Sequence, residues 1–235
     1  YSVAFLGDVN GDGIGDFAFG ATGYNDSTGR AYVYHGWSAA PASSLPGWGA
    51  TASGWQTKGY KESRYGTSVA SAGDVNGDEF ADVVVGASGN DAGGSAAGRA
   101  YIYYGGVDAT FDSTANGTLT GAVGDRLGSA VASAGDVNGD GFADVVMGAP
   151  GPGGGAGHAY VYLGGSGGYF ELLSTLTGVA GDVFGWSIAS AGDVNADGFS
   201  DVVIGAYGND VGGSDAGRAY VYLGGVGTFD TVAAG

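Results

Sequence analysis

The segment DVNGDGFADVVMG, residues 136–148, occurs in four versions along the chain and decides the fold. The other versions are DVNGDGIGDFAFG at 8–20, DVNGDEFADVVVG at 74–86 and DVNADGFSDVVIG at 193–205. Their starting points are 66, 62 and 57 residues apart, a spacing that indicates a repeat architecture. The flanking sequences repeat as well, so the chain is expected to form one domain of four units, approximately 1–65, 66–127, 128–184 and 185–235.

Each unit is expected to consist of short strands joined by turns rich in glycine and asparagine. In the second unit the expected strands are 69–72, 82–86, 99–104 and 118–121. A small antiparallel sheet of this kind cannot bury both of its faces alone, so it must stack on copies of itself. Radial stacking predicts an all-β fold, a β-propeller with four blades in this chain. A β-solenoid is the weaker alternative, because its coils are usually shorter than these units.

The composition supports a packed repeat protein and excludes several classes. Glycine contributes 53 of 235 residues, and the small SVASAG-type strand suits the crowded innermost position, with Tyr and Phe filling the wider space between blades. Hydrophobic residues reach 44% and charged residues 13%, the opposite of a disordered chain. The absence of cysteine excludes disulfides and thiolate metal sites. A net charge of −17 disfavours binding to nucleic acid and to anionic membranes, and it attracts divalent cations. The sequence also has no apolar run long enough to insert into a membrane.

Acidic and amide side chains fall at positions 1, 3, 5 and 9 of every copy of the motif. The predicted ligands are Asp8, Asn10, Asp12 and Asp16 in loop one; Asp74, Asn76, Asp78 and Asp82 in loop two; Asp136, Asn138, Asp140 and Asp144 in loop three; and Asp193, Asn195, Asp197 and Asp201 in loop four. Half of the 24 acids in the chain are therefore concentrated in four loops. A bound cation would relieve their mutual repulsion.

Hard oxygen ligands at this spacing favour about four Ca²⁺ ions, one per loop. The backbone carbonyls at position 7 would complete each shell, and they belong to Ile14, Phe80, Phe142 and Phe199. Position 6 needs a left-handed turn, which glycine allows in three loops, whereas loop two has Glu79 and is expected to be strained. An EF-hand is excluded because position 12 is apolar and belongs to a strand. The plain alternative is a set of Asx-turns in hairpins.

These residues resemble the FG-GAP repeat, the blade unit of integrin alpha-subunit propellers and of related bacterial surface proteins. The Phe-Gly element is Phe184-Gly185, varied to Tyr65-Gly66 and Leu127-Gly128. The Gly-Ala-Pro element is Gly148-Ala149-Pro150, and it departs to Gly-Ala-Thr at 20–22, Gly-Ala-Ser at 86–88 and Gly-Ala-Tyr at 205–207. The resemblance implies calcium in the hairpin between the first two strands of each blade, an extracellular or cell-surface setting, and a role in adhesion or ligand binding.

Two features depart from that family. Its propellers usually have seven blades, whereas this chain has four units. The sequence also begins one residue after an expected Phe-Gly and ends before the outer strand of the last blade, the counterpart of 118–121 and 175–178. We therefore expect the last blade to lack its outer strand, and exposed strand edges to be completed by another chain or by a continuation of this one.

Other motifs point to no catalytic site. His158 occupies the slot of Arg30, Arg99 and Arg218, which are expected to be structural and to bond a neighbouring carboxylate. His35 ends a strand with no nucleophile in a comparable motif. Segment 36–65 contains Trp37, Trp48, Trp55 and Tyr60 beside Lys58, Lys61 and Arg64, a composition that suits either a self-burying connection or a contact for a partner or glycan.

The sequence thus predicts a non-catalytic, calcium-binding extracellular propeller module for adhesion or assembly through protein contacts. One alternative is a lectin that uses aromatic clefts. Another is a propeller fragment of a larger secreted hydrolase.

Overall fold

The computed structural model describes residues 1–36, 56–60, 62–107, 114–153 and 155–226, together with 229 and 233. Throughout these residues the regular structure is β-strand, with no α-helix, as predicted. The strands are β1 (Ser2–Gly7), β2 (Asp16–Ala21), β3 (Arg30–Tyr34), β4 (Gln56–Lys58), β5 (Tyr65–Gly73), β6 (Asp82–Ala87), β7 (Arg99–Tyr103), β8 (Gly117–Thr120), β9 (Ala130–Gly135), β10 (Asp144–Ala149), β11 (His158–Leu163), β12 (Glu171–Thr177), β13 (Phe184–Gly192), β14 (Asp201–Ala206) and β15 (Arg218–Tyr222).

The strands form four antiparallel sheets, one for each copy of the motif. Their orders are β1-β2-β3-β4, β5-β6-β7-β8, β9-β10-β11-β12 and β13-β14-β15. Within each sheet every strand pairs with its neighbour in sequence, so each sheet is an antiparallel meander. In the part of the chain that the structure describes, the fourth sheet has three strands, which agrees with the expected missing outer strand.

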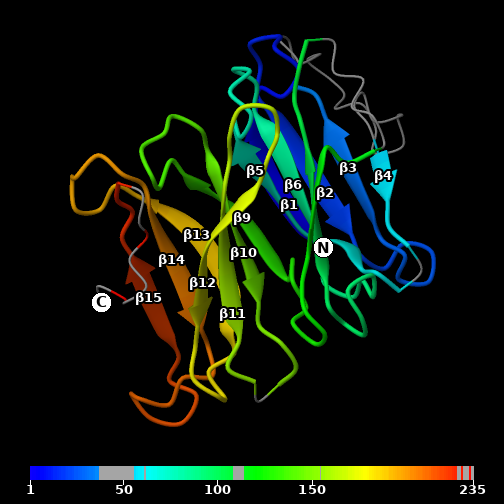
Figure 1. Ribbon diagram of the computed structural model, residues 1–235. Helices are drawn as coiled ribbons and strands as arrows, with labels where there is room; N and C mark the ends of the chain where they lie inside the picture. The colour runs from blue at the N-terminus through cyan, green and yellow to red at the C-terminus, as the bar shows by residue number, and fades with distance from the viewer. Residues whose placement is uncertain are drawn as a thin grey trace, which may run out of the picture.

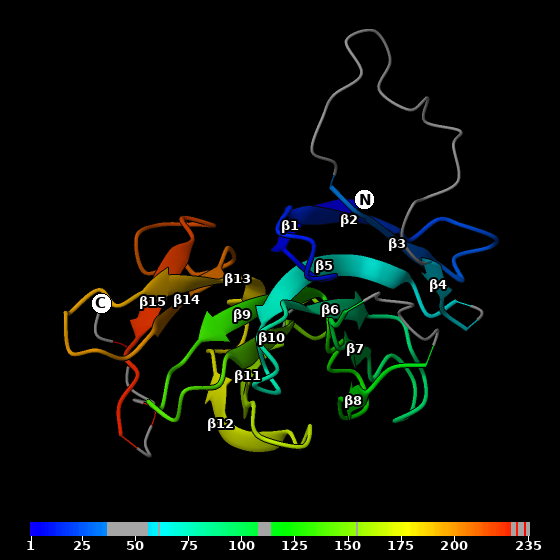
Figure 2. The ribbon, with the colours of Figure 1, turned by 90° about the horizontal axis from the view of Figure 1, so that it is seen from above.

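The four sheets follow one another in chain order and fan outward (Figure 2). Their first strands, β1, β5, β9 and β13, lie nearest one another, and β5 packs beside both β1 and β9. The later strands of each sheet lie farther out, as Figure 2 shows for β12 and Figure 1 for β15. These sheets are stacked as propeller blades, with the small SVASAG-type strands innermost.

Three hydrophobic cores lie between successive sheets, one core for each junction. The first joins Ala18 and Val33 of the first sheet to Val85 and Tyr103 of the second. The second joins Val84 to Met147. The third joins Val161 to Ile204. The tyrosines of the third strands therefore fill the space between blades, as expected from the sequence.

The junctions are also fastened by backbone pairing near the Phe-Gly elements. Isolated parallel bridges join Gly29 to Tyr65, Gly98 to Leu127 and Gly157 to Phe184. A Cβ on Gly98 would lie 2.2 Å from the Leu127 nitrogen, so only glycine permits this approach. The Phe-Gly elements thus bind each blade to the outer part of the preceding one.

Candidate functional site

The four acidic loops lie between the first and second strands of their sheets. Loop three, for example, connects β9 to β10 and runs from Asp136 to Asp144. Both flanking strands are held in register by antiparallel pairing, which begins with the pair Gly135 and Asp144. The hairpin therefore fixes the two ends of the loop and brings position 1 close to position 9.

The position-1 aspartate organises the backbone of its loop. In loop three, Asp136 Oδ1 accepts hydrogen bonds from the amides of Gly139 at 2.6 Å and Asp140 at 3.1 Å. Its other oxygen, Oδ2, accepts from the Gly141 amide at 2.9 Å. Asp8 and Asp74 make the same three contacts in loops one and two. These bonds wrap three successive amides around one carboxylate.

Positions 3 and 5 contact each other in every loop. Asn138 donates from Nδ2 to Asp140 Oδ2 at 2.8 Å, and its Oδ1 accepts from the Asp140 amide at 3.0 Å. Asp140 Oδ1 in turn accepts from the Phe142 amide at 2.9 Å. The side-chain oxygens of positions 1, 3 and 5 are thus gathered on one side of a single turn, as Asx-type bonds predict.

The position-9 aspartate is fully buried at the base of each loop. Asp144 Oδ2 accepts from the Val137 amide at 2.8 Å, and Oδ1 accepts from the Gly164 amide at 3.0 Å. The equivalent pairs are Val9 and Gly36 on Asp16, Val75 and Gly105 on Asp82, and Val194 and Gly224 on Asp201. This carboxylate therefore ties the loop to the end of the third strand.

Burial, and to a smaller extent neighbouring negative charge, shifts the pKa of two of these carboxylates. Burial raises the pKa of Asp82 to about 7; the amides of Gly105 and Val75 oppose the shift, and the charges of Asp78 and Asp74 add to it. Burial likewise raises the pKa of Asp144 to about 7, with further repulsion from positions 5 and 1 of its loop. Positions 1, 5 and 9 are consequently close enough to repel one another.

Two positions in each loop have left-handed backbone. At position 6, Gly13, Gly141 and Gly198 have positive φ, and Glu79 in loop two has a φ of 71°, as the sequence predicts. The structure adds position 4, where Gly11, Gly77 and Gly139 also have positive φ and loop four has Ala196 at 61°. The signal for position 4 was present in the sequence, since three of four copies have glycine there. Loops two and four each carry one strained residue.

The oxygen-rich donor set of each loop suits a hard divalent cation. In the described residues, however, the acidic and histidine side chains form no group of three or more with the geometry of a metal site. The reason is local, because the carboxylates accept backbone amides and position 3 contacts position 5. In loop three, Asp136 Oδ1 accepts two amides, whereas each other carboxylate oxygen accepts one hydrogen bond and keeps a lone pair with which it could bind a cation.

The other residues singled out in the sequence lie in three kinds of setting. Trp37, Trp48, Trp55 and Lys61, and the side chain of Lys58, lie outside the described residues. Tyr60 is 72% exposed. Arg99 donates to the Thr120 hydroxyl at 2.9 Å and lies over the Tyr101 ring, so its contacts are a hydroxyl and a ring rather than the expected carboxylate. His158 contacts Thr177 in the equivalent place at 3.1 Å, which supports its structural role.

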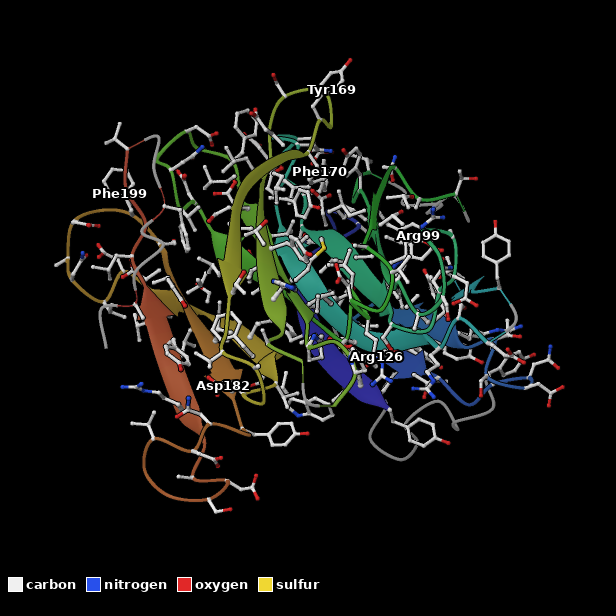
Figure 3. All side chains as sticks on the ribbon, turned by 60° about the horizontal axis from the view of Figure 1, so that its bottom comes forward. Arg99, Arg126, Tyr169, Phe170, Asp182 and Phe199 are labelled. Carbon is white, nitrogen blue, oxygen red and sulfur yellow. The ribbon has the colours of Figure 1, made fainter. Side chains whose placement is uncertain are left out.

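Exposed aromatic residues that sequence reasoning missed lie on two other segments. Trp186 and Tyr207 form an edge-to-face pair with ring centroids 5.1 Å apart, and they are 56% and 52% exposed. Tyr169, at the tip of the β11–β12 connection, points away from the sheets and is 82% exposed (Figure 3). No repeated pattern marks these residues, because each occurs in one unit only.

The family model of the FG-GAP repeat matches residues 1–34, 65–103, 127–162 and 184–222. Each match begins at or near the first strand of one sheet and ends in or next to its third strand. Each therefore includes one acidic loop, at the place where the structure puts it.

Among curated proteins, the chain is 31% identical to integrin alpha-V of Gallus gallus over 223 residues, which cover 89% of this chain and 20% of that protein. It is 34% identical to integrin alpha-5 of Xenopus laevis over 224 residues, again 89% of this chain and 20% of the relative. It is 37% identical to integrin alpha-IIb of Mus musculus over 157 residues, 62% of this chain and 15% of that protein. The chain thus spans at most about a fifth of the length of these relatives.

Proposed function

The chain belongs to the FG-GAP repeat family, and from that premise we propose that it is a calcium-stabilised propeller module that acts in adhesion or assembly through protein contacts. The proposal places it outside the cell or on its surface and assigns it no catalytic role. Calcium would be held in the four loops by the side chains at positions 1, 3, 5 and 9 and the position-7 carbonyl. Bound there, it would neutralise the repelling carboxylates and rigidify each hairpin.

The repeated loop frame is the observation that carries this proposal. The same hydrogen bonds at positions 3, 5 and 7 recur in all four loops, although the loops differ at positions 4 and 6. A frame that only closed a hairpin would not need three carboxylates in each copy, since repulsion among them costs stability. Four bound Ca²⁺ ions would change the net charge from −17 to −9.

Calcium titration of the chain tests the proposal directly. We expect calorimetry to show about four sites and EDTA to lower the melting temperature by many degrees, because each ion at 100 times its Kd adds about 2.7 kcal/mol to the free energy of unfolding. The Asp140→Ala variant removes position 5 of loop three and should bind one ion fewer.

The charge-matched control is Glu171→Ala, which removes an exposed carboxylate of β12 outside the loops. It should bind as many ions as the original chain. Identical melting curves in calcium and in EDTA would refute the calcium proposal, and so would equal stoichiometry for the original chain and Asp140→Ala.

A carbohydrate-binding role is the second candidate, favoured by the exposed pair Trp186 and Tyr207. Aromatic rings that remain half-exposed can stack on sugar rings, and no rearrangement of the protein is needed to expose them. A glycan array read with and without calcium separates the two functions. A module for protein contacts should show no saturable sugar binding, whereas a lectin should lose its signal in Trp186→Ala.

A further inference from the structure

Each junction between neighbouring sheets packs a face of large side chains on a face of small ones. The large face of the third sheet includes Met147, and it lies in one core with Val84 and Ala100 of the second sheet. The first junction is alike, with Val85 and Tyr103 packed on the small face that carries Ala18. A blade therefore has a large face toward the preceding blade and a small face toward the next.

The large face of the first sheet has no neighbour in the described structure. Val3 and Phe5 on β1 are 68% and 73% exposed. Phe5 pairs with Phe17, and Phe17 pairs with Tyr34, so these side chains share one face of the sheet. The Phe17 and Tyr34 rings stack with centroids 5.3 Å apart. Residues equivalent to Phe17 in the second and third sheets, Val83 and Val145, are fully buried.

The small face of the fourth sheet is uncovered in the same way. Ala189 pairs with Val203, and Val203 pairs with Val221, so these three side chains share that face. Ala189 is exposed, and the other two are half-buried. Val194, at position 2 of loop four, is 55% exposed, whereas Val9, Val75 and Val137 at the same position are fully buried by the next blade.

The acidic loops carry a matched contact at each junction. The position-7 ring of one loop lies against the position-4 glycine of the preceding loop. A Cβ at Gly77 would lie 2.6 Å from Phe142 Cε1, and a Cβ at Gly139 would lie 2.6 Å from Phe199 Cε1. Gly11 contacts Phe80 in the same manner. Phenylalanine at position 7 therefore requires glycine at position 4 of its neighbour.

Both members of this pair change at the two uncovered faces. Loop one has the smaller Ile14 at position 7, and loop four has the larger Ala196 at position 4. Within the described residues, the matching backbone bonds between loops occur at the three internal junctions only. Position-8 amides donate to the preceding loop at each internal junction, as from Ser200 to the Asp136 carbonyl at 2.9 Å. Gly15 is the equivalent donor of loop one, and the Asp193 carbonyl is the equivalent acceptor of loop four.

We propose that these two faces bind each other between copies of the chain, head to tail. The occupant of each face is a second copy, because one chain presents both halves of a junction whose contacts the structure shows three times. Ile14 of one copy would lie against Ala196 of the other. The smaller isoleucine at position 7 leaves room for the alanine methyl group at position 4. Such a heterologous contact closes into a ring if its rotation allows and otherwise extends into an open assembly.

Sedimentation analysis in calcium-containing buffer tests the proposal, with the original chain expected to associate. Phe5→Asp should block the large face and Ala189→Arg the small face, and each variant alone should be monomeric. Mixed in equal amounts, the two variants should form heterodimers, because one intact junction remains. Tyr169→Asp, which removes another exposed ring, is the control and should associate like the original chain. Melting curves and circular dichroism verify that every variant is folded.

A size exchange in the loops provides the sharper test. Ile14→Phe should weaken association at least about tenfold, because the new ring meets the Ala196 methyl group, and adding Ala196→Gly should restore it. Phenylalanine at position 7 folds in the other three loops, so the variant retains its structure. An original chain that stays monomeric up to about 1 mM would overturn the proposal. Failure of the mixed variants to pair, or of Ala196→Gly to rescue, would also overturn it.

Discussion

The two middle sheets and the two end sheets have similar sequences but different surroundings. Every residue of β6 and β10 is buried, because a sheet covers each of their faces. In β2 buried and half-buried residues alternate, and β14 has half-buried residues on one face only. Burial in this molecule is therefore set by how many neighbours a sheet has.

The sequences of the two end strands, β2 and β14, differ in how far they reflect the missing neighbour. β2 reads Asp-Phe-Ala-Phe, with the two large phenylalanines on the uncovered face and the small Ala18 on the face that the second sheet covers. β14 reads Asp-Val-Val-Ile, the uninterrupted apolar run of a strand covered on both faces. The fourth sheet thus has the sequence of a middle sheet, which agrees with a further blade packing on its small face.

The largest difference in stability between a middle-sheet variant and an end-sheet variant is expected at the buried position-9 aspartate. Asp144→Ala leaves two amides without partners, and both of its hydrogen bonds are buried. We expect a loss of about 4 kcal/mol in the free energy of unfolding. Asp201→Ala removes the same two bonds at the end sheet. Asp201 is itself fully buried, but its donors Val194 and Gly224 are partly exposed, so water can reach the freed amides and about half that loss is expected.

Urea unfolding of both variants in the same calcium-containing buffer measures this contrast. Both loops lose the candidate ligand at position 9, so the difference between the variants mainly reports how deeply the two hydrogen bonds are buried. Equal losses would show that the end sheet is as well covered as the middle one.

A smaller contrast is expected for the apolar side chains of the second strands. Met147 is fully buried, and Met147→Ala should cost about 3 kcal/mol because it leaves a cavity between two sheets. Phe19, the equivalent residue of the first sheet, is half-buried on the uncovered face, and Phe19→Ala should cost about 1 kcal/mol despite its larger side chain. Thermal unfolding at low protein concentration compares them, and a greater loss for Phe19→Ala would contradict this account of the end sheet.

Much of the molecule could be predicted from the sequence because the information lies within each unit. The repeated motif identifies the strands, the acidic loops and the left-handed residue at position 6, including Glu79. Contacts between units were harder to predict, since they join position 7 of one loop to position 4 of another about 60 residues away. Gly139 and Phe199 each fit their own loop, and only the stacking of sheets shows that they touch.

The aromatic segment 36–65 illustrates a different limit. Its tryptophans have no counterpart in the other three units, so repetition offers no template for their placement. The same holds for Trp186 and Tyr207, which the sequence alone did not single out. Single-copy features depend on tertiary surroundings that a repeat pattern does not describe.

The smallest contrast concerns one added methyl group at two positions of loop three, of which one contacts the next blade and the other does not. Gly139 and Gly141 both have left-handed backbone, so alanine costs each about 1 kcal/mol in conformational strain. A Cβ at Gly141 has nothing within 4 Å, whereas a Cβ at Gly139 meets the Phe199 ring. Gly139→Ala should therefore cost about 1 kcal/mol more than Gly141→Ala.

Replacing the Phe199 ring isolates the extra cost of the contact between that ring and the new methyl group. In a Phe199→Ile background, Gly139→Ala and Gly141→Ala should cost the same within error, because isoleucine reproduces the smaller partner found in loop one. Urea unfolding of the four combinations measures the coupling between the two sites. A coupling of zero would mean that the ring is free to move aside, and Ala196 would then reflect no constraint from a neighbouring blade.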